Sequence, residues 1–147
     1  MSPACAAPPQ PLHEQTGMAE AVLREIHALL EVFAGTGETA CVDLGGLPMS
    51  GRDRVELDEV LGRGEVAATI DLAGRSEVWE TAFSGVWRVR HFGAEKIAVD
   101  LIEITSCPEI LRTDRRDASR AAQKLALALQ QRNAAFAEIS TEMSDGQ

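Results

Sequence analysis

The central part of the chain alternates hydrophobic and polar residues in four short runs. Between Gly64 and Pro108 these runs cover residues 66–72, 77–83, 86–92 and 96–105, with short turn-forming segments between them. A repeat of two residues is typical of strands with one buried face. Because the connections are too short for crossover helices, the pattern predicts an antiparallel β-meander of about four strands.

Two segments before the meander carry hydrophobic residues at helical spacing. Residues 18–33 form a broad apolar stripe, and Thr16 is the expected N-cap of this helix. A second helix is expected to begin after Ser50, which can cap it, and to end near Leu61. Asp53 follows three residues after Ser50, where a carboxylate favours the positive end of the helix. Stripes of this width indicate helices that pack on a sheet.

A last helix is expected after the meander. Asp114 or Asp117 can cap it, and its apolar face runs to about Phe136. Residues 39–44 can form a further short strand that pairs at a sheet edge. Together the elements predict an α+β fold, in which helices cover one face of an antiparallel sheet of four or five strands.

The expected domain limits follow from composition. Residues 1–15 are rich in Pro and Ala and predict a disordered N-terminal tail, residues 16–138 a single α+β domain, and residues 139–147 a C-terminal tail.

Net charge narrows the classes of partner. The 147 residues carry a formal net charge of −9, so no excess of Lys and Arg is present to displace phosphate counterions, and no nucleic-acid partner is expected. Docking on anionic lipid is disfavoured for the same reason. No apolar run reaches the length of a membrane span, and the first residues lack the features of a signal peptide. We therefore expect no membrane insertion and a cytoplasmic location.

Cysteine and histidine usage predicts neither a metal site nor a cofactor. Cys5, Cys41 and Cys107 are widely spaced, with no Cys-x-x-Cys pair, and the three histidines are dispersed. Cys41 is expected to be a buried thiol that behaves as a small hydrophobe, whereas Cys107 is the cysteine to test for exposure. Phosphate-binding loops and nucleophile elbows are also missing from the sequence, so no catalytic set is expected.

Five residues of the meander are candidates for binding a partner: Trp79, Trp87, Arg88, Arg90 and Glu103. Each tryptophan either packs in the core or anchors a partner from the uncovered sheet face, a role in which Trp and Arg are over-represented. Glu103 interrupts the apolar side of the last strand. Either a bulge one or two residues earlier exposes it, or it is a sheet-face acid paired with Arg88 or Arg90.

Five short blocks then occur in the order found in a known family: Leu47–Ser50, Leu61–Val66, Glu77–Thr81, Gly85–Val89 and Ile102–Ile104. They resemble blocks of the HupH/HyaF hydrogenase expression proteins, and the resemblance covers roughly residues 23–129. Longer members carry this unit twice. This chain has room for one copy and resembles the short, single-unit HupJ/HoxT-like members.

The resemblance implies a non-catalytic assembly factor for membrane-bound nickel–iron hydrogenases. The implied partners are the iron–sulfur small subunit or its precursor, a rubredoxin-type protein and other maturation factors. The chain lacks the four cysteines needed to be a rubredoxin itself. Two other function classes stay open: a small enzyme that uses an acid such as Glu103, and a self-associating structural module in which Leu127 and the sheet edge build a homodimer.

Overall fold

The computed structural model describes residues 15–71, 73–94 and 96–146, and the chain divides into two compact units. The first unit extends to Pro108 and the second begins at Glu109. The elements of the first unit are α1 (Met18–Thr36), β1 (Ala40–Asp43), α2 (Gly51–Leu61), β2 (Ala67–Asp71), β3 (Arg75–Glu80), β4 (Val86–Gly93) and β5 (Lys96–Ile104). Those of the second are the 3₁₀ turn η1 (Glu109–Leu111) and α3 (Arg115–Ser144).

The five strands form one antiparallel sheet in the order β1-β5-β4-β3-β2. Strands β2 to β5 pair with their neighbours in sequence, which confirms the predicted meander. The short strand β1 pairs with β5 at one edge, where Val42 lies opposite Ile102. The α+β class and the edge strand are therefore as the hydrophobic pattern predicts.

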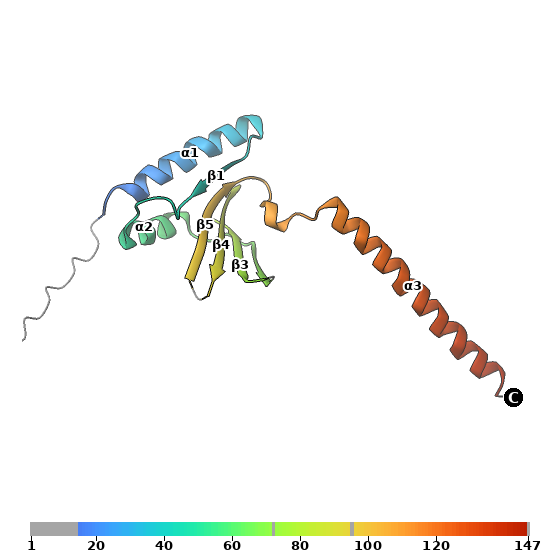
Figure 1. Cartoon of the computed structure of the whole chain (residues 1–147). Coiled ribbons are helices and arrows are strands. Elements are labelled where there is room, and N and C mark those ends of the chain that lie inside the picture. Colours follow the sequence, from blue (N-terminus) through green and yellow to red (C-terminus); the bar gives the residue numbers. More distant parts are fainter. Residues whose placement is uncertain (1–14, 72, 95, 147) are drawn as a thin grey trace, which may run out of the picture. The chain divides into compact units, whose positions relative to one another are not determined.

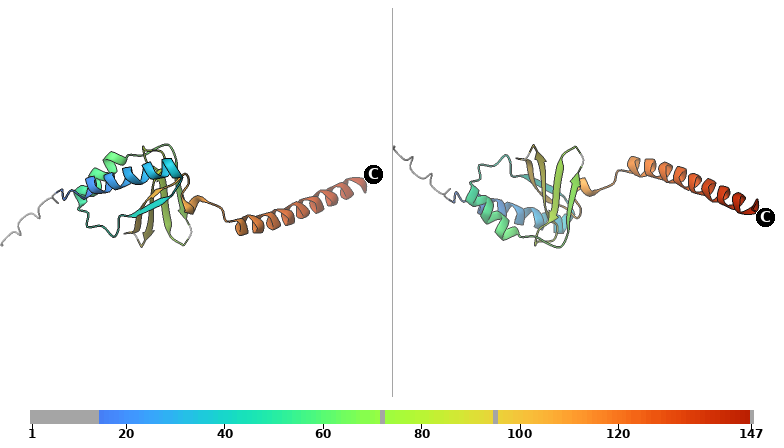
Figure 2. Two further views of the ribbon diagram at one scale, coloured as in Figure 1. Left: turned by 90° about the horizontal axis from the view of Figure 1, so that it is seen from above. Right: turned by 90° about the horizontal axis from the view of Figure 1, so that it is seen from below.

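Helices α1 and α2 lie on the same face of this sheet (Figures 1 and 2). Their apolar stripes meet the sheet in a single cluster of buried side chains, in which Leu57 of α2 and Val86, Ile102 and Ile104 of the sheet are fully enclosed. Close packing of this kind is the main source of stability in a domain of this size. The cluster also determines which strand residues face the helices.

The N-cap of α1 differs from the expected one, and the expected residue contacts α2 instead. Gly17 is the N-cap of α1, and its φ of 84° suits a glycine, so Thr16 is not the cap. The Thr16 hydroxyl instead donates to Asp53 at 2.5 Å. Asp53 also completes a capping box at α2, in which the predicted cap residue Ser50 accepts from the Asp53 backbone N–H through its Oγ. One carboxylate thus holds the start of both helices.

Helix α3 is longer than its hydrophobic pattern suggested. Asp114 is its N-cap and accepts from the Arg116 N–H at 2.7 Å. The expected end near Phe136 is wrong, because the helix continues to Ser144 and includes most of the segment expected to be a tail. The other expected tail lies outside the described residues, except for Gln15.

Within the described part of the chain, no helix is long and apolar enough to cross a membrane.

Candidate functional site

Trp79 and Arg88 occupy adjacent strands on the helix-covered face of the sheet. They lie directly opposite each other in the β3–β4 register. Val86, two residues before Arg88, belongs to the core cluster under the helices, and side chains two residues apart point to the same face. Arg90 follows at the next position on that face. Three of the five candidate residues are therefore brought together by strand alternation.

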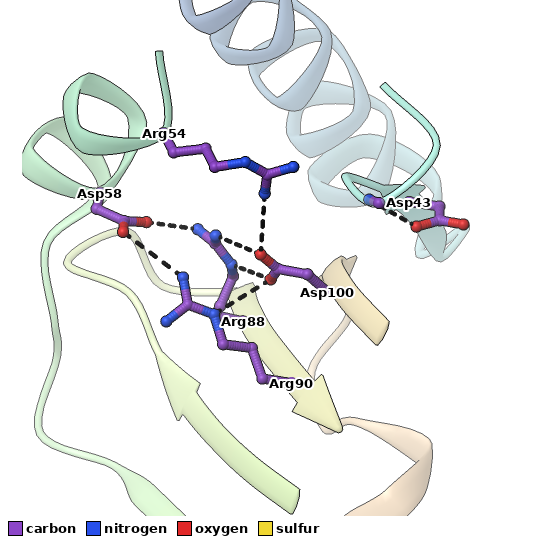
Figure 3. A network of polar contacts seen from close by, with 7 residues as sticks. Asp43, Arg54, Asp58, Arg88, Arg90 and Asp100 are labelled. Carbon is purple, nitrogen blue, oxygen red and sulfur yellow. Dashed lines mark hydrogen bonds and ion pairs between the residues drawn. The ribbon is translucent and has the colours of Figure 1, made fainter. Parts of the chain in front are cut away.

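The guanidinium group of Arg88 is the centre of a buried ionic network (Figure 3). Its Nε and Nη2 donate to the two carboxylate oxygens of Asp100 at 2.6 and 2.9 Å, and its Nη1 donates to Asp58 of α2 at 2.8 Å. Arg88 is 2% exposed and Asp100 3%. Burial alone would lower the pKa of Arg88, but the hydrogen bonds and charge of Asp100, together with Asp58, outweigh it and raise the pKa. Arg88 is thus a fixed charge that ties α2 to the sheet.

Two further arginines approach the same carboxylates at longer distances. Arg90 lies 3.5 Å from Asp58 and 3.4 Å from Asp100, and Arg54 lies 3.7 Å from Asp100 (Figure 3). Three guanidinium groups therefore share two carboxylates, so the network as a whole is positive. In a chain with a net charge of −9, this is a local reversal of sign.

The indole of Trp79 lies beside two of the cations. The guanidinium carbon of Arg63 is 4.1 Å from the ring centroid, and that of Arg90 is 5.1 Å away. Both distances are within the range of cation–π attraction. Trp79 is only 6% exposed, whereas Arg63 is exposed and takes part in none of the ion pairs within the described residues. The ring therefore holds an outward-facing cation in place.

A small cavity of about 90 Å³ opens beside this indole. It is lined by Asp58, Leu61, Gly62, Arg63, Trp79, Thr81, Arg88 and Arg90. The lining offers N–H donors from exposed Arg63 and half-buried Arg90. The described residues that line it include no Cys or His and one carboxylate, that of Asp58, which is bound to arginine. Among the described residues, no group of three or more His, Cys, Asp or Glu is placed to hold a metal ion. The free polar groups of the lining are therefore cationic N–H donors.

Trp87 and Glu103 lie on the other face of the sheet, directly opposite each other in the β4–β5 register. Trp87 is 6% exposed, and its indole N–H donates to the Thr105 carbonyl at 3.0 Å. Both indoles are therefore packed. Glu103 also lies opposite Cys41, which is exposed rather than buried as expected.

Both expected arrangements of Glu103 are wrong. The register shift between β4 and β5 falls at His91 and Phe92, not next to Glu103. Unbroken alternation from that point turns Glu103 away from Arg88 and Arg90, and their acidic partner is Asp100.

Four residues of the site were missed from the sequence: Arg54, Asp58, Arg63 and Asp100. A signal existed only for Asp100, an acid within the apolar run of a strand whose neighbour carries arginines. The other three approach through helix packing and the turn after α2, and their positions follow from no local pattern.

Comparisons with known proteins agree with the family that the sequence blocks resemble. Residues 17–131, which include every residue of the cavity, match the family model described as HupH hydrogenase expression protein, C-terminal conserved region. HyaF of the hydrogenase-1 operon of Escherichia coli K12 is 38% identical over 91 residues, covering 60% of this chain and 31% of HyaF. HupH of Rhodobacter capsulatus is 28% identical over 116 residues, covering 78% and 42% of the two chains.

The chain therefore spans less than half the length of these relatives. A solved structure, the hydrogenase expression protein HupH from Thiobacillus denitrificans, superposes with a TM-score of 0.76 at 35% identity. The match covers 80% of this chain and 99% of that one. The chain belongs to the HupH hydrogenase expression protein family, as a carrier of its C-terminal conserved region.

Proposed function

We propose that this chain is a non-catalytic accessory factor that acts in the cytoplasm during formation of a membrane-bound nickel–iron hydrogenase. Its family membership supports the hydrogenase role, since the relatives are named hydrogenase expression or formation proteins. An accessory factor of this kind acts by holding a client protein, and the cavity beside Trp79 supplies a means of doing so.

The observation that carries this proposal is the cation held against Trp79. Arg63 is exposed and stacked on a buried indole, and Arg90 reaches the same ring from within the cavity. A pre-positioned guanidinium loses little conformational freedom when it binds a carboxylate. Trp and Arg are also enriched at binding hot spots. Since the cavity presents arginine N–H groups, the client contributes an acidic segment that reaches it. The client is the iron–sulfur small subunit or its precursor, and a rubredoxin-type protein is a second partner.

Direct binding of purified proteins tests the proposal. Arg63 is the residue to change. It is exposed, so its substitution should leave the fold intact, whereas substitution of the buried Trp79 or Arg88 would disturb folding. Arg63→Glu should weaken binding of the small-subunit precursor by about 2 kcal/mol or more, roughly thirty-fold in Kd. Calorimetric titration measures the loss, and the melting temperature of the variant should stay unchanged.

Arg52→Glu is the matched control. Arg52 is also an exposed arginine, on α2, but it does not line the cavity, and its reversal makes the same change in net charge. Its binding should stay close to that of the unaltered chain. Equal losses in the two variants would mean that only overall charge matters and would overturn the cavity as the site. If the precursor does not bind at all, titration with the rubredoxin-type protein and the large subunit shows whether another client takes its place.

A further inference from the structure

Helix α3 carries a strict heptad repeat along one face. The positions of this repeat are spaced alternately by four and three residues: Ala118, Ala122, Leu125, Leu129, Arg132, Phe136, Ile139 and Met143. Only Arg132 breaks the apolar series. This spacing averages 3.5 residues per turn, the period at which two helices supercoil around each other with their a and d positions in contact.

The large members of this stripe face solvent. Leu125, Leu129, Phe136, Ile139 and Met143 are between 51% and 79% exposed. None of the described residues of α3 is buried. A continuous apolar stripe along a helix of 30 residues is typical of a binding surface, because scattered single hydrophobic residues do not form such a repeat.

The positions beside the stripe are small and almost free of charge. In heptad terms the flanking e and g residues are Ser119, Ala121, Ala126, Ala128, Asn133, Ala135, Ser140 and Glu142. Small flanking side chains allow two helices to approach closely. Only Glu142 is charged among them, so an identical helix meets little electrostatic repulsion here, and no charged e or g pairs select a different partner.

The two ends of α3 carry opposite charge. Residues 115–124 contain four cations and one acid, whereas residues 138–145 contain three acids and no cation. A second copy of the helix in antiparallel orientation brings each basic end beside an acidic end. A parallel copy would bring like charges together at both ends.

Side-chain size favours the same orientation. When the stripes of two antiparallel copies are aligned about their centre, Ala118 meets Met143 and Ala122 meets Ile139, so each small residue faces a large one. Leu125 then meets Phe136. In a parallel pair each residue would face its own copy, which would leave Ala–Ala layers under-packed and set two Arg132 side chains in one layer.

We propose that α3 mediates dimerisation of this chain through an antiparallel two-stranded coiled coil. This surface shares no residue with the cavity beside Trp79, so the test of dimerisation does not depend on the proposed function. It also differs from a dimer built on Leu127, which lies at the f position on the far side of the helix.

The mass of the full chain in solution tests the proposal. Sedimentation equilibrium over a range of concentrations should show a dimer for the unaltered chain. Leu125→Glu places a charge in the apolar seam and should weaken dimerisation by at least a hundred-fold. Leu127→Glu is the matched control, since Leu127 is equally exposed, at 60% against 62% for Leu125, but lies outside the seam. It should remain a dimer.

A monomer at all concentrations, a tetramer, or equal effects of the two substitutions would overturn the proposal. Orientation is tested in a chain whose three cysteines are replaced by serine. Ala118→Cys and Met143→Cys, mixed and oxidised, should form a disulfide between the two variants, while neither variant should crosslink to itself. Self-crosslinking of each variant would show a parallel pair instead.

Discussion

Asp100 lies directly opposite Arg90 in the β4–β5 register, yet its two carboxylate oxygens bind the diagonal neighbour Arg88, at 2.6 and 2.9 Å. Arg90 Nε reaches the same carboxylate only at 3.4 Å. The diagonal pair is almost fully buried, and Asp58 of α2 completes it from the helix layer. The sheet and α2 are therefore joined by a charged contact as well as by apolar packing.

Removing the charge of Asp100 alone should be strongly destabilising. Asp100→Asn leaves the buried guanidinium of Arg88 without its main partner, and the free energy of unfolding should fall by about 3–5 kcal/mol. Urea denaturation followed by circular dichroism measures it. The double variant Arg88→Met with Asp100→Leu should recover most of this loss, because it leaves no unpaired buried charge. A loss below about 1 kcal/mol for Asp100→Asn would show that the pair is not buried as described.

Asp53 should make stability depend on acid pH. The hydrogen bond from the Thr16 hydroxyl is the largest cause that lowers its pKa, from 3.8 to about 2; burial opposes it, and bonds from Ser50 assist it. Because the folded-state pKa is depressed, the carboxylate stabilises the fold above pH 3.8, and this contribution is lost as the pH falls towards 2. Asp53→Asn should therefore be less stable at neutral pH, and its deficit should shrink across that interval.

Denaturation at a series of pH values measures that deficit. Thr16→Val removes the largest favourable hydrogen bond, so the pKa of Asp53 in the folded state should lie closer to 3.8. The acid loss of stability should then be smaller in this variant and should be complete at a higher pH. A deficit of Asp53→Asn that stays constant with pH would contradict the assignment.

Gly64 and Gly35 should respond oppositely to alanine. A Cβ on Gly64 would lie 2.7 Å from the Thr81 carbonyl oxygen, part of a backbone that cannot move aside without disturbing β3, so Gly64→Ala should cost about 1–3 kcal/mol. Gly35 lies inside α1 with open space around the Cβ position, and Gly35→Ala should stabilise the chain by about 0.5–1 kcal/mol. Thermal denaturation of the two variants compares them, and a stable Gly64→Ala would disprove the close approach.

Cys41 should react slowly with alkylating reagents although it is exposed. Partial desolvation of the thiol by neighbouring atoms is the main cause that raises its pKa, and the negative charges of Glu103 and Asp43 raise it further. The reactive thiolate is therefore disfavoured at neutral pH. Glu103→Gln removes one of these charges and should lower the pH midpoint of alkylation at Cys41, followed by mass spectrometry. Glu59→Gln, an exposed acid on α2, is the control and should leave the midpoint unchanged.

Much of the fold is determined by local pattern. Alternation with a period of two and connections too short for a helix leave an antiparallel meander as the simple solution for residues 66–105. Helical stripes and the capping signal at Ser50 predict α1 and α2 for the same reason, because each element must bury one face. The end of α3 was predicted too early, since Ile139 and Met143 continue its repeat beyond Phe136.

The candidate site was decided by tertiary structure. Which strand residues share a face with Arg88 depends on the register shift at His91 and Phe92, and a shift of one residue moves every later side chain to the opposite face. The contact between Arg63 and Trp79 depends on the packing of α2 on the sheet and on the turn that follows α2. The sequence by itself determined the elements and the family of this protein, because those depend on neighbours along the chain. Only the tertiary structure decided that Asp100, and not Glu103, neutralises Arg88, because that pairing depends on register and burial between separate strands.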